Sequence, residues 1–267
     1  MKLRKINELF SLKDRVAIVT GGAGYLGTAE SYALAEAGAR VIVADIDIEE
    51  AKKVAGKITE SGLYAEAEKI DLSKEESIAR VIDSVYKRYG KLDILINNGF
   101  FGKSVPLDDM SLDDWQCAID GSINQVFLCT KFAVEKMKIK RKGSIVNIAS
   151  MYGVVSPDLS VYGKTGWDNP ANYGVAKAGV IQFTKYCASY YAEYGIRVNA
   201  VSPGCFAHDF PENKEFDRLW KYLTDKTMLK RIGMQDEIKG IILYLASDAS
   251  SYCTGQNIII DGGWTAW

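Results

Sequence analysis

The sequence predicts a doubly wound α/β fold, with a seven-stranded parallel sheet and helices on both faces, in a single domain spanning residues 1–267. Short β-branched runs alternate with amphipathic stretches along the chain, and the first run ends in a glycine-rich turn. No repeat, low-complexity tract or linker interrupts the alternation. The carboxyl ends of the strands should therefore share one edge, where ligands of such sheets bind.

The elements are expected in a regular order. Residues 15–22, "RVAIVTGG", predict a buried strand because they form a β-branched run that ends in glycines. The helix predicted at 27–38 has apolar residues at helical spacing and Gly38 as its C-cap. Further strands are expected at 40–45, 64–71, 92–98, 143–150, 196–204 and 257–263. Further helices are expected at 48–62, 74–90, 111–137 and around Tyr173. Residues 151–172 and 205–220 are expected to be irregular.

Composition limits the classes of function. Net charge is −1 and 48% of the residues are hydrophobic, so nothing in the charge favours nucleic acid or an anionic membrane as a partner. No apolar run is long enough to span a bilayer, and the basic N-terminus lacks an apolar signal core, so we expect a cytoplasmic protein. The five cysteines form no Cys-x-x-Cys pair and the chain has one histidine, which disfavours disulfides, metal sites and Ser-His-Asp hydrolysis.

A glycine motif follows the first predicted strand. In "TGGAGYLG", Gly21, Gly24 and Gly27 would allow a tight turn, close approach of a pyrophosphate and packing of the helix on the sheet. The next strand ends in Asp45, whose carboxylate can accept hydrogen bonds from ribose hydroxyls and would repel a 2′-phosphate. Asp71, at the end of the third strand, is a candidate for the adenine side. The glycine motif therefore predicts a dinucleotide cofactor, and Asp45 predicts that this cofactor is NAD.

Tyr173 and Lys177 lie four residues apart in "NPANYGVAKAG", which places both on one face of a helix. The competing Tyr162 has Gly166 at that spacing, so it has no such lysine. An ammonium one turn away favours the phenolate and would lower the pKa of Tyr173 toward neutrality. This pair is suited to exchange the proton that accompanies hydride transfer at a carbonyl.

Six motifs in this order give the chain a resemblance over nearly its full length: "TGGAGYLG", "LINN", "IVNIAS", "NYGVAK", "IRVNAVSPG" and "DGGW". It resembles the short-chain dehydrogenase/reductase family, and within it the bacterial sugar and polyol oxidoreductases, including gluconate dehydrogenase-like and flagellin-modification proteins. The resemblance implies a catalytic tetrad that falls on Ser122, Ser150, Tyr173 and Lys177. The implied cofactor-binding residues are Gly21, Gly24, Tyr25, Leu26, Gly27, Asp45, Ile46, Asp71, Leu72, Asn98, Gly99, Tyr173, Lys177, Pro203 and Gly204.

The chain departs from the family pattern at several positions. The glycine spacing is typical of the extended branch with sugar epimerases, and Tyr25 stands at the usual middle glycine. Phe100 replaces a glycine of the motif that begins with Asn97 and Asn98. Ser122 stands where the tetrad has an asparagine. The family asparagine acts through its backbone carbonyl at a break in the helix, and Gly121 next to Ser122 can permit such a break. If the asparagine side chain were needed chemically, Ser122 would be a poor substitute and Ser122→Asn would raise activity. We favour the backbone role, and we expect a helix distortion there, with that carbonyl within water-bridging reach of Lys177.

The substrate walls are expected in the two irregular segments, with Tyr152, Trp167, Phe206 and His208 as substrate-binding residues. Aromatic and polar groups together favour a sugar, sugar acid or polyol. Two alternatives stay open: an epimerase or dehydratase that retains NAD, and a nucleotide-binding regulator with a relict site. The apolar helices at 111–137 and around Tyr173 pair in relatives, which predicts a homotetramer or at least a dimer.

Overall fold

The computed structural model describes residues 3–162, 169–206 and 214–267. Seven parallel strands form one sheet, as predicted, and their order is β3-β2-β1-β4-β5-β6-β7. The strands are β1 (Val16–Thr20), β2 (Arg40–Asp45), β3 (Ala65–Lys69), β4 (Ile94–Asn97), β5 (Gly143–Ile148), β6 (Ile196–Pro203) and β7 (Asn257–Ile260). The strand order reverses between β1 and β4, so their carboxyl ends flank the crevice in which such folds bind ligands.

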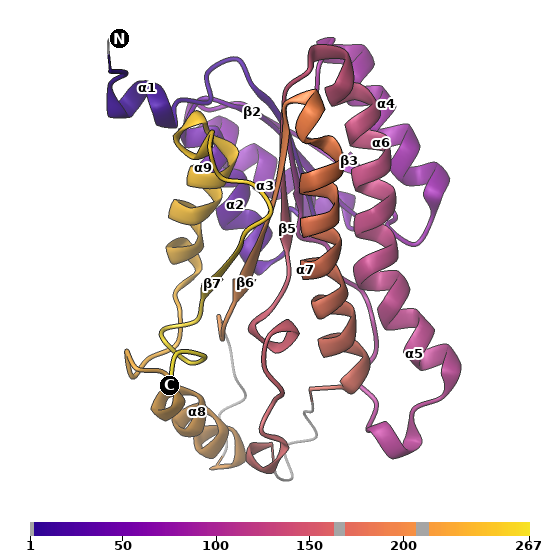
Figure 1. Cartoon of the computed structure of the whole chain (residues 1–267), viewed down its shortest axis with the longest axis vertical. Coiled ribbons are helices and arrows are strands. Elements are labelled where there is room, and N and C mark those ends of the chain that lie inside the picture. The colour runs from indigo at the N-terminus through magenta and orange to yellow at the C-terminus, as the bar shows by residue number, and fades with distance from the viewer. Residues whose placement is uncertain (1–2, 163–168, 207–213) are drawn as a thin grey trace.

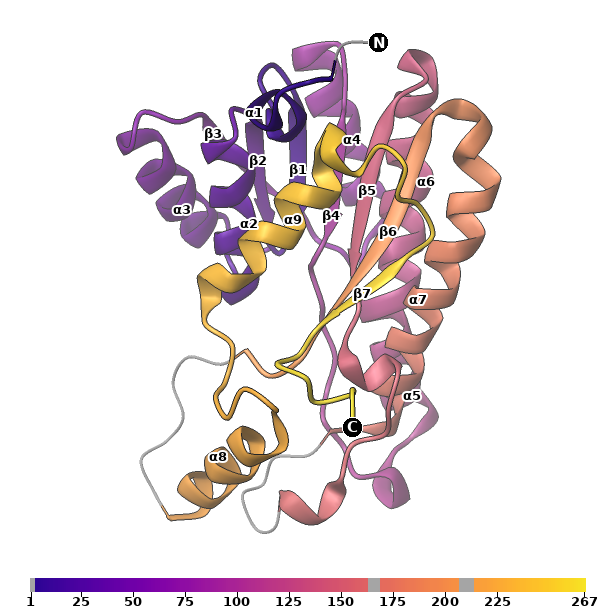
Figure 2. The ribbon, with the colours of Figure 1, turned by 60° about the vertical axis from the view of Figure 1, so that its left-hand side comes forward.

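Helices cover both faces of the sheet (Figures 1 and 2). One apolar layer joins the sheet to α2 (Tyr25–Glu36), α3 (Ile48–Glu60) and α9 (Lys239–Ala246). The other joins it to α4 (Glu75–Tyr89), α6 (Gln125–Lys140) and α7 (Ala171–Tyr191). In β1, Ala17 and Val19 belong to the first layer while Val16 and Ile18 belong to the second, which explains why the strand is apolar without alternation.

The structure differs from the predicted elements in three places. The single helix expected at 111–137 is divided into α5 (Leu112–Ile119), a π-helical segment (Asp120–Asn124) and α6. The segment expected to be irregular at 205–220 contains the start of α8 (Lys214–Lys226), which lies beyond the carboxyl ends of the strands (Figure 1). A short helix, α1 (Ile6–Phe10), precedes β1 and was not expected either.

The apolar residues of α8 pack beyond the sheet edge. Phe216, Leu219 and Leu223 form a cluster with Ile232 and with Tyr162, which belongs to the other segment expected to be irregular. A helix at this place encloses the space outside β5 and β6. The fold therefore gives the ligand edge an additional wall.

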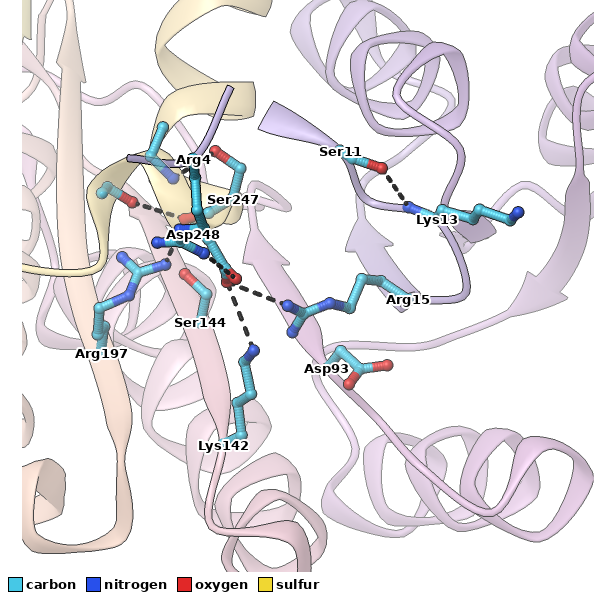
Figure 3. A network of polar contacts seen from close by, with 12 residues as sticks. Arg4, Ser11, Lys13, Arg15, Asp93, Lys142, Ser144, Arg197, Ser247 and Asp248 are labelled. Atoms are coloured by element: carbon cyan, nitrogen blue, oxygen red, sulfur yellow. Dashed lines mark hydrogen bonds and ion pairs between the residues drawn. The ribbon is translucent and has the colours of Figure 1, made fainter. Parts of the chain in front are cut away.

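A polar network centred on Asp248 lies at the amino ends of the strands, opposite the ligand edge (Figure 3). Its carboxylate pairs with Arg15 at 3.0 Å, Arg4 at 3.3 Å and Lys142 at 3.5 Å. Arg15 precedes β1 and Lys142 precedes β5, so one side chain connects the N-terminal segment to two strand starts. This network lies far from the ligand edge and serves the fold.

Candidate active site

The glycine-rich turn after β1 is packed too closely for side chains. Gly21 has φ +60°, and a Cβ built on it would stand 2.8 Å from the Gly99 Cα. A Cβ on Gly27 would stand 2.1 Å from the Gly21 carbonyl oxygen. The Asn98 amide donates to the carbonyls of Thr20 and Gly21 at 3.1 and 2.9 Å, which fixes the turn to the end of β4. These glycines therefore shape a cradle at the start of α2.

Asp45 is held at the end of β2 by the backbone. Its carboxylate accepts from the N–H groups of Ala23 and Asp47, each at 3.1 Å. These bonds place a fixed negative charge beside the glycine-rich turn. Nearby Asp71 is bonded to Ser73 and lies 3.1 Å from the Lys74 ammonium, and these hydrogen bonds hold the pKa of Asp71 below its usual range.

A cavity of about 500 Å³ opens between these groups. Eight of the predicted cofactor residues line it: Gly21, Gly24, Asp45, Ile46, Asp71, Leu72, Asn98 and Gly99. Tyr25, Leu26 and Gly27 lie in the first turn of α2 and do not line it. Pro203 ends β6, and Gly204 lines a second cavity. The first cavity, beside a glycine cradle and a helix N-terminus, suits the adenosine and pyrophosphate of a dinucleotide.

The second cavity, of about 550 Å³, contains the predicted reacting groups. Ser150 and Tyr173 both line it, and the Ser150 hydroxyl acts to lower the pKa of the Tyr173 phenol. Ser150 also accepts from the Tyr152 N–H at 3.1 Å, which fixes its rotamer at the end of β5. The structure therefore brings the strand-ending serine and the tyrosine of α7 to one cavity.

Lys177 lies behind this pair rather than in the cavity. It is 4% exposed, and its ammonium donates to the Ile148 carbonyl at 2.8 Å. Burial lowers the pKa of Lys177 to about 8, against the opposing charge of Glu30. Its Nζ lies 5.7 Å from the centre of the Tyr173 ring. The spacing of four residues thus places the two side chains side by side, as predicted.

The pKa of Tyr173 is not lowered as expected by the groups of the protein alone. Burial raises the pKa of the Tyr173 phenol, and the Ser150 hydrogen bond only partly offsets this. The Lys177 ammonium is turned to the Ile148 carbonyl and does not overcome the burial. Additional positive charge at the site would be needed to bring the phenol into its working range.

Comparisons with known proteins agree with this geometry. A family model described as enoyl-(acyl carrier protein) reductase matches residues 24–265. The chain is 36% identical over 256 residues to a 3-oxoacyl-(acyl-carrier-protein) reductase from Synechocystis sp., covering 95% of this chain and 98% of that protein. It is similar, with a TM-score of 0.88 and 32% identity, to a short-chain type dehydrogenase/reductase from Mycobacterium marinum, covering 99% and 100% of the two chains. The chain belongs to the short-chain dehydrogenase/reductase family.

A further solved structure bears on ligands. A gluconate 5-dehydrogenase from Burkholderia cenocepacia, in complex with NADP and tartrate, is similar with a TM-score of 0.86 and 29% identity, covering 98% of this chain and 100% of that chain. Members of the short-chain dehydrogenase/reductase family bind a nicotinamide cofactor, and the cradle and first cavity of this chain fit that role.

Phe100, one departure from the family pattern, lies between the two cavities and lines both. Its ring meets the Tyr173 ring edge-on, with centroids 5.2 Å apart and an interplanar angle of 87°. The Lys177 ammonium lies 5.6 Å from the Phe100 ring centroid. The sequence showed that a glycine was replaced, but it gave no indication that the phenyl ring would lie beside both Tyr173 and Lys177.

Ser122, the other departure, lies in the π-helical segment that divides the long helix. The Gln125 N–H bonds to the carbonyls of both Asp120 and Ser122. The predicted distortion at Gly121 and Ser122 is confirmed. The Ser122 hydroxyl is buried without a hydrogen-bond partner, so it does not replace the family asparagine by a side-chain contact. Whether its carbonyl bridges to Lys177 through water stays a prediction.

The expected substrate residues divide into two groups. Tyr152 and Phe206 line the second cavity, whereas Trp167 and His208 lie outside the described residues. Sequence reasoning missed several further lining residues: Phe100, Lys103, Ser104, Met151, Leu219 and Leu223. The spacing of Phe216, Leu219 and Leu223 is helical, and it could have predicted α8 as a wall.

Proposed function

We propose that this protein is an NAD-dependent oxidoreductase that transfers a hydride between nicotinamide and a secondary alcohol or ketone. The observation that carries the proposal is that Ser150 and Tyr173 line the same cavity, with Lys177 one helical turn behind Tyr173. The dinucleotide cradle opens beside this pair, with Phe100 common to both cavities.

Each side chain has one role in the proposed reaction. When bound, the nicotinamide accepts or returns the hydride. Ser150 donates a hydrogen bond to the substrate oxygen, and Tyr173 takes the hydroxyl proton during oxidation or returns it during reduction. Lys177 binds the cofactor ribose and favours the phenolate of Tyr173. Because burial raises the pKa of Tyr173 in the protein alone, the positive charge of the oxidised ring would complete the activation.

Asp45 supports NAD over NADP as the cofactor. Its carboxylate is fixed by two backbone N–H groups beside the turn that would hold the adenosine ribose. A 2′-phosphate there would meet a like charge, and the segment 21–27 contains no arginine or lysine to offset it. The NADP in the gluconate 5-dehydrogenase complex is a property of that protein.

A hydroxylated substrate, such as a sugar, sugar acid or polyol, fits the mixed character of the cavity wall. The hydroxyl groups of Ser104, Tyr152 and Tyr162 line it together with aromatic and aliphatic side chains. Lys103 is the one charged side chain among its described lining residues, and it makes no salt bridge within the described part of the chain. A cation at this place favours substrates that carry a carboxylate.

A substrate panel tests the proposal against its two alternatives. Sugars, sugar acids and polyols are incubated with NAD⁺ or NADP⁺, and reduced cofactor is followed by absorbance. Net NADH formation supports the oxidoreductase. Isomerised or dehydrated product without net NADH would indicate an NAD-retaining epimerase or dehydratase. Cofactor binding without any turnover across the panel would favour a nucleotide-binding regulator.

We further propose that the protein assembles as a homotetramer, or at least a dimer, through α6 and α7. Aromatic side chains on these helices face outward: Phe127 is 46% exposed, Tyr186 63% and Tyr190 57%. Such side chains are typical of buried interfaces between subunits. Light scattering at micromolar concentration should give a multiple of the chain mass, and a monomer would contradict the assembly.

None of the described helices is long and apolar enough to cross a membrane, and a cytoplasmic location stays a prediction.

A further inference from the structure

A third cavity, of about 540 Å³, opens at the amino ends of the strands. Its walls come from the segment before β1, the starts of β5 and β6, and the turn that follows α9. It shares no lining residue with the two cavities of the candidate active site. The proposed reaction therefore leaves this cavity without a role.

The charged residues of the third cavity are mostly cationic. Four cations and two carboxylates line it: Arg4, Arg15, Lys142, Arg197, Asp93 and Asp248. Four against two leaves an excess of two positive charges. Because the whole chain has a net charge of −1, this excess is a local feature of the cavity. A concave site with an excess of one charge attracts ions of the opposite charge.

One carboxylate serves three of these cations. Asp248 lies 3.0 Å from Arg15, 3.3 Å from Arg4 and 3.5 Å from Lys142 (Figure 3). A guanidinium or an ammonium carries several N–H donors. Within the described part of the chain, the side chains of these three cations have no acceptor besides Asp248. Most of their donors therefore remain available to an anion in the cavity.

Arg197, the fourth cation, contacts no carboxylate among the described residues. Its guanidinium donates to the carbonyls of Leu245 and Ser247 at 2.9 and 3.0 Å, and to that of Cys253 at 3.4 Å. These neutral groups orient the guanidinium but do not balance its charge. Burial lowers the pKa of Arg197, as expected where a charge is held partly away from water.

Asp93, the second carboxylate, is engaged by its own neighbours. It accepts from the Val16 N–H at 2.9 Å and lies 4.0 Å from the Lys91 ammonium. Lys91 does not line the cavity, so Asp93 already has a cation of its own outside it. The positive excess of the cavity is therefore not balanced by the carboxylates that line it.

We propose that the third cavity is an anion-binding site for a phosphate group, either the free ion or part of an organic ester, held by the cations that line it. A phosphate carries close to two negative charges at neutral pH, which matches the excess. Guanidinium groups present paired N–H donors that fit its oxygens. The volume is typical of small-molecule sites, so an organic group could be accommodated beside the exposed ring of Tyr252. This inference does not depend on the proposed oxidoreductase function.

Isothermal titration calorimetry with inorganic phosphate tests the site, with chloride at matched ionic strength as the reference. Lys142→Gln and Arg4→Gln should each raise the dissociation constant for phosphate by about tenfold, because each removes one charge and its donors. Lys140→Gln is the matched control, since Lys140 is exposed nearby but does not line the cavity, and its value should stay within about threefold. Equal dissociation constants in all four proteins, or binding no stronger than that of chloride, would overturn the proposal.

Asp248→Asn separates an anion site from a purely structural network. The substitution removes a carboxylate that competes with phosphate for the same cations, so the dissociation constant for phosphate should fall. Circular dichroism checks that the variant is folded. A variant that is folded and binds phosphate no more tightly than the wild type would show that these cations serve the fold alone.

Two further arms identify the source of the phosphate and exclude the glycine cradle. Phenyl phosphate is titrated in place of inorganic phosphate: tighter binding assigns the site to an ester, and equal or weaker binding assigns it to the free ion. Each titration is repeated with saturating NAD⁺, because a helix N-terminus beside a glycine-rich turn can also bind phosphate. Binding that persists with NAD⁺ and depends on Lys142 supports the proposal, whereas binding abolished by NAD⁺ would contradict it.

Discussion

Replacing Asp45 with Asn should relax the choice of cofactor without dismantling the loop. The asparagine keeps a side-chain oxygen that can accept the Ala23 N–H, which Asp45 binds at 3.1 Å. The negative charge is lost, together with the acceptor for the Asp47 N–H, which the second carboxylate oxygen binds in the wild type. In the wild type this charge would face the 2′-phosphate of NADP, so the variant should bind NADP⁺ more tightly relative to NAD⁺.

The magnitude follows from the partly exposed position of Asp45 at the end of β2. Two unit charges about 6 Å apart repel by about 3 kcal/mol at an effective dielectric constant of about 20. Salt screens part of this repulsion, so we expect the ratio of the two dissociation constants to change by about 10- to 100-fold.

Titration of tryptophan fluorescence with each cofactor measures the ratio. Asp71→Asn is a matched control, because Asp71 lines the same cavity but is engaged by Ser73 and Lys74. That variant should leave the ratio within about threefold, or below 1 kcal/mol. Equal affinities of the wild type for NAD⁺ and NADP⁺, or an unchanged ratio in Asp45→Asn, would refute the placement of Asp45 at the ribose.

Four other substitutions test three separate parts of the structure. Ser122→Ala should keep turnover within roughly tenfold of wild type. Gly121→Ala should lower the free energy of unfolding by at least about 1–3 kcal/mol in denaturant, because its Cβ would stand 1.6 Å from the Phe101 carbonyl oxygen. A larger loss of turnover in Ser122→Ala, together with an unchanged stability of Gly121→Ala, would contradict a backbone role. Lys103→Gln should raise KM for acidic substrates by about tenfold while leaving matched neutral polyols unchanged, and an equal effect on both would exclude a carboxylate contact. Burial would raise the pKa of Asp248, but the charges of Lys142 and other cations hold it below its usual range, so its stabilisation is present above the unfolded pKa and is lost as pH falls through the folded one. Asp248→Asn should therefore lower the free energy of unfolding by about 1 kcal/mol at pH 7 and by less in acid, and a pH-independent difference would contradict the ion-pair account.

The sheet could be predicted because its strands are buried on both faces. In β1, Val16 and Ile18 pack on one face, and Ala17 and Val19 pack on the other. The strand is therefore a continuous apolar run, which is a strong sequence signal for a buried parallel strand. The glycine-rich turn was predictable for a related reason, since a side chain at Gly27 would collide with the backbone. Local sequence is informative where one conformation is sterically required.

Other features depend on contacts between distant segments. The ring of Phe100 meets Tyr173 across 73 positions of the chain, and no local pattern encodes that contact. The same is true of Glu30, which looks like an ordinary helix residue until its burial without a hydrogen-bond partner is known. Helix α8 is different, because the spacing of Phe216, Leu219 and Leu223 was visible in the sequence and was outweighed by the preceding irregular stretch.

The most direct test of the proposed chemistry is a single-turnover comparison of the wild type with Tyr173→Phe, using saturating NAD⁺ and an alcohol identified by the substrate panel. The substitution removes only the phenolic hydroxyl and leaves Ser150, Lys177 and both cavities in place. NADH should therefore form at least about 10²-fold more slowly, while the affinity for NAD⁺ is largely unchanged. NADH formation at the wild-type rate would contradict the assignment of Tyr173 as the acid/base, and with it the proposed mechanism.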